Sequence, residues 1–212
     1  MAAELTLYTN PMSRGQIARW MVHESGLPHD VVLLDYGTTM KAADYRAINP
    51  MGKVPAIIHN GQVVTECAAI CAYLADAVPE RDLAPPPAER GDYYRWLFFA
   101  AGPLEQAVIT RALGVEVAAE KRAMVGFGSY EEAVGALEGW LKTHDFVAAG
   151  RFTAADVYVG SHVMWGLRFG SLPTLPAFEG YAARLAERPA ARSARAADEA
   201  LIAEMQAAAT AS

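Results

Sequence analysis

Residues suited to holding a small peptide lie close together around one predicted hairpin. Asn60-Gly61 is a strong signal for a two-residue hairpin turn, because both central residues need positive φ. Val54-Pro55 stands at the mouth of this hairpin, and a cis proline there would leave the backbone N–H and C=O of Val54 free to pair with an extended peptide. Glu66, at the start of the next helix, could take an ammonium group. The pattern predicts a site for a small peptide with a free amino end.

Composition excludes several other classes of protein. The 212 residues suffice for one or two domains, and 53% hydrophobic residues are enough to build a core. A net charge of −6 argues against nucleic-acid binding, which would favour a basic face. No apolar run approaches the roughly 18 residues of a membrane helix, and the N-terminus has no pattern of a signal peptide. We therefore expect a cytoplasmic protein.

The cysteines and histidines do not predict a metal site. Cys67 and Cys71 are four residues apart on one predicted helix, whereas zinc fingers and thioredoxin-like redox pairs need other spacings. Two thiols without an export signal fit a reducing cytosol. The five histidines, among them His162, form no cluster with the spacing of metal ligands. We expect no metal.

The first part of the chain alternates between strand and helix patterns. Its order is strand, helix, strand, helix, strand, strand, helix, which predicts an α/β domain. A stripe of Ile17, Ala18, Met21 and Val22 marks the first helix, and Gly26 is its expected end. The continuous apolar run 31–34 is typical of a buried parallel strand. The predicted elements are 4–8, 14–25, 31–34, 41–47, 56–59, 62–64 and 66–77.

A proline-rich segment, 79–87, separates this part from an all-helical remainder. Pro85-Pro86-Pro87 cannot lie inside a helix, and beyond it the pattern is helical to the end. We therefore expect a domain over 1–78, a linker over 79–88 and an all-α domain over 89–212. The predicted helices of that domain are 89–114, 116–144, 153–169, 175–187 and 191–208.

One helix start in the second part has a capping box. Thr153 is followed three residues later by Asp156, just before an apolar run. The threonine side chain can cap the N3 amide while the aspartate reaches back to the amide of the cap residue. We expect this pair to stabilise the fold and to take no part in chemistry.

Four motifs together resemble the cytosolic glutathione transferases. They are Leu-Tyr-Thr-Asn-Pro-Met-Ser-Arg at 7–14 with Ala-Arg-Trp at 18–20, Asn-Pro-Met-Gly-Lys-Val-Pro at 49–55, Glu-Cys-Ala-Ala-Ile at 66–70 and Phe-Thr-Ala-Ala-Asp at 152–156. The resemblance extends from about residue 4 to about residue 195 and is nearest to bacterial members related to the serine-type classes. It implies a thioredoxin-like domain followed by an all-helical domain, usually in a homodimer. It also implies binding of glutathione as co-substrate, stabilisation of its thiolate, and attack on an apolar electrophile.

The resemblance leaves the residue that activates the thiol open among three. Ser13, just before the first helix, is placed like the catalytic serine of the serine-type members, although it could act only as the N-cap of that helix. Tyr8 has the spacing of tyrosine-type members, or it is a core tyrosine of the strand. Asn10 could donate to sulfur as in members that reduce disulfides.

The resemblance also implies contacts for the backbone of glutathione. Val54, before the expected cis Pro55, should pair with the cysteinyl backbone. Lys53 and Lys41 are candidates for the glycyl carboxylate, although either could be an ordinary surface lysine.

The γ-glutamyl end of glutathione is expected at the start of the helix that begins near Glu66. Glu66 should face its ammonium group, and the amide of Cys67 its carboxylate. Family members usually have serine at the position of Cys67, so this chain lacks a hydroxyl donor there. Cys67 could form a mixed disulfide with glutathione, or it is a small buried thiol.

The second substrate is harder to predict. Tyr94 and Phe98 lie four residues apart on one face of the first helix of the second part, either in the core or at the electrophile pocket. Besides conjugation to an apolar electrophile, two alternatives stay open. One is another glutathione-dependent reaction, such as disulfide reduction, isomerisation or reductive cleavage of an ether or halide. The other is glutathione or ligand binding without catalysis.

Overall fold

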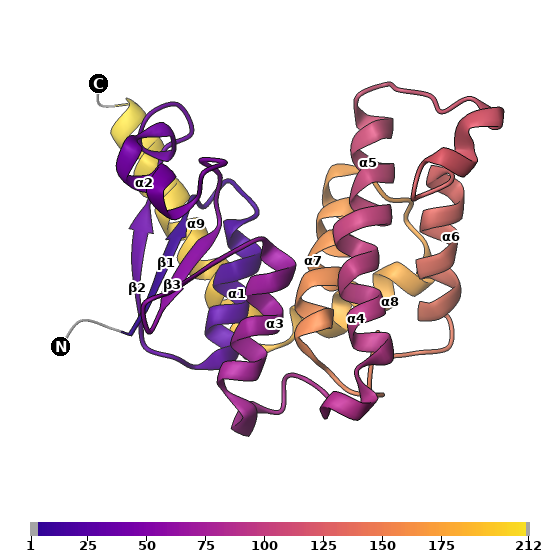
Figure 1. The fold of residues 1–212 in the computed structure, drawn as a ribbon, viewed down its shortest axis with the longest axis horizontal. Helices are drawn as coiled ribbons and strands as arrows, with labels where there is room; N and C mark the ends of the chain where they lie inside the picture. Colours follow the sequence, from indigo (N-terminus) through magenta and orange to yellow (C-terminus); the bar gives the residue numbers. More distant parts are fainter. Residues whose placement is uncertain (1–3, 211–212) are drawn as a thin grey trace. The chain divides into compact units, whose positions relative to one another are not determined.

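The first of two compact units is built on a four-stranded sheet. The computed structural model describes residues 4–210, and the units comprise 4–81 with 187–210, and 82–186. The strands β1 (Leu5–Thr9), β2 (His29–Leu33), β3 (Ala56–His59) and β4 (Gln62–Thr65) lie in the order β2-β1-β3-β4 (Figure 1). β2 is parallel to β1, whereas β3 is antiparallel to both β1 and β4. The predicted α/β order is confirmed.

Alternation along β1 gives the sheet two differently covered faces. Leu5, Leu7 and Thr9 are fully buried on one face, beside α1 (Gly15–Ser25) and α3 (Cys67–Ala77). Tyr8 points to the other face, where it packs with Tyr45 of the short helix α2 (Ala43–Ile48). A one-turn helix, η1 (Thr39–Lys41), precedes α2, so the predicted helix over 41–47 is two elements.

The prediction that residues 31–34 form a buried strand is wrong. β2 is parallel to β1, as expected, but it is an edge strand with only one neighbour in the sheet. Val31, Val32 and Leu33 are 38%, 37% and 43% exposed. The continuous apolar run indicated a strand correctly but could not reveal that its outer side has no partner strand.

The hairpin and the first helix form as their local signals predict. Asn60 and Gly61 have φ of 51° and 76°, so both central residues of the turn take the left-handed conformation. The predicted stripe of α1 is buried, and Gly26 ends the helix with φ of 70°. The Val54–Pro55 peptide bond is cis.

The last helix belongs to the first unit, which differs from the expected domain over 89–212. α9 (Pro189–Thr210) packs along α1. Nε of Arg19 donates to Oδ1 of Asp198 over 2.7 Å, and both side chains are buried. Nε of Arg188 donates to Oε1 of Glu24 over 2.7 Å. These contacts join segments far apart in the sequence, so no local pattern could have predicted them.

The second unit, residues 82–186, contains helices and connecting loops, and no strand is assigned within it. Its main helices are α4 (Gly91–Phe99), α5 (Glu105–Ala112), α6 (Tyr130–Leu141), α7 (Ala154–Phe169) and α8 (Pro176–Ala186). A π-helical turn, η4 (Ala100–Leu104), contains Pro103 and joins α4 to α5, so the predicted helix over 89–114 is nearly continuous. The predicted helix over 116–144 is wrong in its first half. A 3-10 segment, η5 (Ala119–Met124), and a loop precede α6 there.

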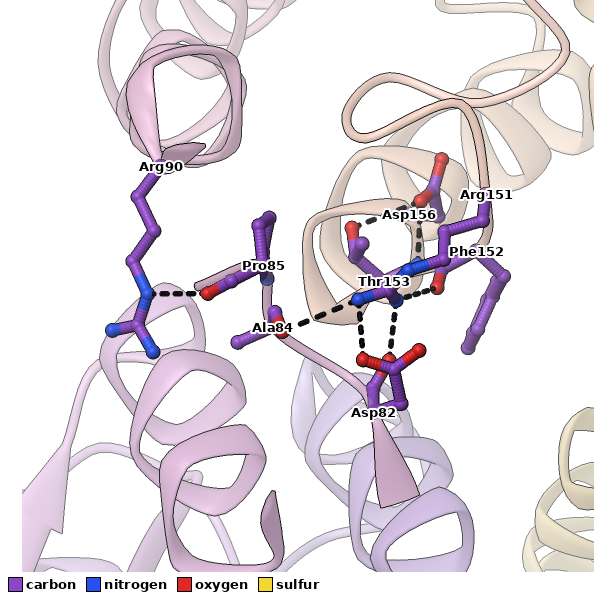
Figure 2. A network of polar contacts seen from close by, with 8 residues as sticks. All are labelled: Asp82, Ala84, Pro85, Arg90, Arg151, Phe152, Thr153 and Asp156. Atoms are coloured by element: carbon purple, nitrogen blue, oxygen red, sulfur yellow. Dashed lines mark hydrogen bonds and ion pairs between the residues drawn. The ribbon is translucent and has the colours of Figure 1, made fainter. Parts of the chain in front are cut away.

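The capping box of α7 is present and is the centre of a larger polar network (Figure 2). Oδ2 of Asp156 accepts from the amide of Thr153 over 2.8 Å and from its hydroxyl over 3.0 Å. Oδ1 accepts from the amide of Val147 over 2.8 Å and from the Tyr181 hydroxyl over 2.9 Å. Burial raises the pKa of Asp156 to about 6, against the opposing effect of these four donors.

A second part of this network fixes the chain at the entry to the second unit. Figure 2 shows Arg151 reaching Asp82 and the carbonyl oxygens of Ala84 and Phe152. The amide of Ala154, the first residue of α7, donates to the carbonyl of Leu83 over 2.8 Å. The linker after Arg81 is therefore bound to the start of α7.

Replacing Asp156 by alanine should lower the free energy of unfolding by about 3–5 kcal/mol, because four buried donors lose their acceptor. The matched control is Asp145→Ala. Asp145 pairs with Arg184 at an exposed site, so its loss should cost about 0–1 kcal/mol. Denaturant unfolding of both variants measures the difference, and equal costs would contradict the role of the network.

The same carboxyl should make stability depend on pH. Its folded pKa of about 6 lies above the ordinary 3.8, so the native state holds the proton more tightly than the unfolded chain between these values. Stability from this group therefore rises as pH falls from about 6 to about 4. Denaturant titrations across this range should show a smaller pH slope for Asp156→Asn than for the wild type.

Candidate active site

The turn between β1 and α1 is fixed by one buried asparagine. Nδ2 of Asn10 donates to the carbonyl of Leu34 over 2.9 Å, and Oδ1 accepts from the amide of Met12 over 2.9 Å. Asn10 is 2% exposed. One end of its amide thus ties the turn to the chain that follows β2, and the other end fixes the turn internally.

Ser13 lies at the start of α1 and is partly buried. Its Oγ donates to the carbonyl of Asn10 over 2.6 Å and accepts from the amide of Gly15 over 2.9 Å. α1 begins at Gly15 with Arg14 as its N-cap, so Ser13 lies one residue before the cap position and the prediction that it is the N-cap is wrong by one residue. Its hydroxyl lies at the positive end of the α1 dipole, where an anion is favoured.

Tyr8 lies on the other face of the sheet. It is half-buried, and its ring centroid is 5.7 Å from that of Tyr45. Val54 packs against the same cluster. The sequence predicts that Tyr8 either activates the thiol or is a core tyrosine of the strand. These contacts fit the role of a core tyrosine.

The segment before β3 is held by one side chain from α2 and one from the residue directly after it. The hydroxyl of Tyr45 donates to the carbonyl of Lys53 over 2.6 Å, and Nδ2 of Asn49 donates to the same oxygen over 2.8 Å. Burial raises the pKa of Tyr45 to about 12, so this hydroxyl stays a donor at neutral pH. Val54 and cis Pro55 follow, and the pairing of β3 begins only at Ala56.

The two lysines differ in their surroundings. Nζ of Lys41 donates to the carbonyl of Gly52 over 2.6 Å and so ties η1 to this segment. Both lysines are exposed, so this bond of Lys41 is what distinguishes them. Lys53 is thus the better placed of the two for a negatively charged ligand.

The start of α3 lies beside the start of α1. Sγ of Cys67 is 3.5 Å from the carbonyl oxygen of Arg14, and Cys67 is 7% exposed. Glu66 is exposed and has φ of 67°, which is unusual for a residue with a side chain. Cys71 is fully buried, and burial raises the pKa of its thiol.

The structure therefore brings most of the predicted site residues into the first unit. Ser13 and Cys67 are joined through the contact at Arg14, and Tyr8 and Val54 share one cluster. Tyr94 and Phe98 belong to the second unit, where both are exposed, at 42% and 70%. Their ring centroids are 6.4 Å apart, so they lie on one face of α4 as predicted.

Sequence reasoning missed Tyr45 and Asn49, which hold the Lys53 carbonyl and so fix the backbone before Val54. They lie four residues apart, one on α2 and one directly after it, so both face the same side. That spacing is the signal that could have found them.

Among residues 4–210, no group of three or more His, Cys, Asp or Glu is placed to hold a metal ion. Within the same range, no helix is long and apolar enough to span a bilayer.

Comparison with known proteins agrees with this arrangement. Residues 12–77 match the N-terminal domain family of glutathione S-transferases, and residues 103–189 match the C-terminal domain family. Glutathione S-transferase GstA of Escherichia coli O157:H7 is 28% identical over 92% of this chain and 98% of its own. Glutathione S-transferase 3 of Zea mays is 30% identical over 73% of this chain and 74% of its own.

Solved structures extend the likeness to the fold. A sphingomonad glutathione S-transferase complexed with glutathione has a TM-score of 0.73 and 28% identity, covering 92% of this chain and 98% of its own. A glutathione S-transferase from Xylella fastidiosa has a TM-score of 0.74 and 26% identity over the same shares. With a mixed sheet and helices in one unit and helices alone in the other, the chain belongs to the glutathione S-transferase family.

Proposed function

We propose that the protein binds glutathione in its first unit, stabilises the thiolate and transfers it to an apolar electrophile. The observation that carries this proposal is the contact between Cys67 and the Arg14 carbonyl. It sets the start of α1, with Ser13, beside the start of α3, with Glu66. Ser13, the proposed site for the sulfur, and Glu66, the proposed site for the ammonium group, are then close enough for one small peptide to reach both.

Ser13 is the proposed donor to the glutathione sulfur. A free thiol has a pKa of about 8.5, so lowering it by two units takes about 2.7 kcal/mol of selective anion stabilisation. The Ser13 hydroxyl and the positive end of the α1 dipole can supply this together. Tyr8 is the weaker candidate, because it points to the face of the sheet covered by α2.

The remaining contacts follow the backbone of the peptide. We place the cysteinyl backbone against Val54, whose geometry is set by cis Pro55 and by the bonds from Tyr45 and Asn49 to the preceding carbonyl. The glycyl carboxylate goes to Lys53, since Lys41 is engaged with Gly52.

The γ-glutamyl group completes the proposed binding mode. Its ammonium group goes to Glu66 and its carboxylate to the amide of Cys67 at the start of α3. Cys67 is a buried thiol bound to a backbone oxygen, which supports a packing role over a mixed disulfide.

Disulfide reduction, the alternative that rested on Asn10, has less support. The Asn10 amide is occupied by Leu34 and Met12, and its side chain is buried. For the electrophile, we propose that Tyr94 and Phe98 supply an apolar surface. Their exposure supports this role over one in the core.

The first test measures the pKa of the bound glutathione thiol by absorbance near 240 nm. In the wild type it should lie about two units below 8.5, and Ser13→Ala should return it toward that value with a loss of kcat/KM of about 100-fold. Ser129→Ala is the matched control, because Ser129 caps α6 in the second unit by accepting from the Glu132 amide over 3.1 Å. It should lower stability by about 1 kcal/mol and leave the thiol pKa unchanged. An unshifted pKa in the wild type would reduce the protein to a glutathione carrier.

Glu66 allows a second test, because its backbone strain and its proposed charge contact can be separated. Glu66→Gly should raise the free energy of unfolding by about 1 kcal/mol, since glycine accepts a φ of 67° freely. The same change should weaken glutathione binding about tenfold or more through loss of the carboxylate. Ala149→Gly, at an exposed position with φ of 56°, should stabilise without any effect on glutathione. Unchanged affinity in Glu66→Gly would remove Glu66 from the site.

We further propose that the protein forms a homodimer, which the family resemblance supports. We also propose a cytoplasmic location, which the two free cysteines support. On a calibrated column the protein should elute near twice its chain mass of 22.8 kDa. Elution at the mass of one chain would exclude the dimer.

A further inference from the structure

Thr9 carries a buried hydroxyl that takes part in no hydrogen bond of the described part of the fold. It is the last residue of β1, is 0% exposed and lies on the face of the sheet toward α1. Its Oγ1 has no hydrogen-bond partner among residues 4–210. An unpaired buried hydroxyl costs free energy, whereas valine would fill the same volume in a strand without that cost. Packing alone therefore does not explain a threonine here.

This hydroxyl lies close to that of Ser13. A Cβ placed on Gly15 would lie 1.9 Å from Oγ1 of Thr9, 2.9 Å from Oγ of Ser13 and 3.1 Å from the carbonyl oxygen of Asn10. The hydroxyl oxygens of Thr9 and Ser13 are therefore near neighbours on the same side of Gly15, although no hydrogen bond joins them.

The role proposed for Ser13 would be helped by a hydrogen-bond donor to its hydroxyl oxygen. Its hydroxyl has one proton, which it donates to the Asn10 carbonyl, while its oxygen accepts from the Gly15 amide. To donate to a sulfur, the Ser13 O–H must leave Asn10. The Ser13 oxygen can still accept a second hydrogen bond, which would polarise its O–H and strengthen it as a donor.

We propose that Thr9 is a positioning residue for the thiolate donor: its O–H donates to Oγ of Ser13 when the Ser13 side chain shifts to turn its O–H toward the glutathione sulfur. This inference rests on the proposed function of Ser13. Thr9 is fully buried and does not itself touch the substrate. Among the described residues, the Thr9 hydroxyl has no hydrogen-bond partner until glutathione binds. It therefore lowers the stability of the free protein but strengthens the stabilisation of the thiolate.

Thr9→Val tests the proposal, with Thr9→Ser as the variant that keeps the hydroxyl. Thr9→Val should raise the pKa of the bound glutathione thiol by about half a unit to one unit, a roughly 3- to 10-fold drop in the thiolate-to-thiol ratio. Its Tm should equal or exceed that of the wild type, because an unpaired buried hydroxyl is removed. Thr9→Ser should keep the wild-type thiol pKa. Thr9→Ala is a second variant without a hydroxyl and should raise the thiol pKa in the same way.

A double-mutant cycle with Ser13→Ala shows whether Thr9 acts through Ser13. In that background, Thr9→Val should have no further effect on the thiol pKa. An unchanged thiol pKa in Thr9→Val, or the same increase with and without Ser13, would overturn the inference while the proposed function stands. An unshifted thiol pKa in the wild type would instead remove the proposed function, and the role of Thr9 with it.

Discussion

The start of α1 packs directly on the end of β1, and the position of Ser13, the proposed thiolate donor, is set from that contact. A side chain at position 15 would collide with Thr9, so only glycine allows the helix to begin there. The Asn10 amide then fixes the turn to the chain after β2. As a result, Ser13 is held at the start of α1, where the helix dipole favours an anion.

α1 must then be held firmly, and it has partners on two sides. α3 brings Cys67 and Glu66 to its start, while α9 binds it through the pair of Arg19 and Asp198. Burial raises the pKa of Asp198 to about 6 even beside Arg19, so desolvation outweighs the attraction of the guanidinium. Such a pair contributes less to stability than to a single arrangement of the two helices. The last helix thus supports the position of Ser13 from a segment far away in the sequence.

The second unit also contains a buried carboxylate with several hydrogen-bond partners, and it stabilises the fold there. Asp156 is buried with four donors around it, and it joins the start of α7 to the loop at Val147 and to Tyr181 of α8. The network fixes the entry of the chain into this unit without contributing a reactive group. Its high burial and raised pKa would resemble an active-site carboxyl, but every acceptor position is filled by structure.

Signals confined to a few neighbouring residues were sufficient to predict much of this protein. The Asn60-Gly61 turn, the buried stripe and glycine end of α1, and the capping box of α7 each depend on contacts within about four residues. Candidate site residues could be named because they lie in such motifs. The roles of Ser13 and Tyr8 could not be separated in this way, because both positions fit the spacing.

Tertiary structure decided what depends on distant neighbours. The sequence could not show that β2 is an edge strand, because its exposure follows from the order of the sheet. Nor could it assign α9 to the first unit, since the ion pairs of Asp198 in α9 and of Arg188 just before it connect residues more than 160 positions apart. The unpaired hydroxyl of Thr9 is known only once α1 has packed on β1. Sequence determines local conformation through near neighbours, whereas burial and partnership are set by which surfaces meet when the whole chain has folded.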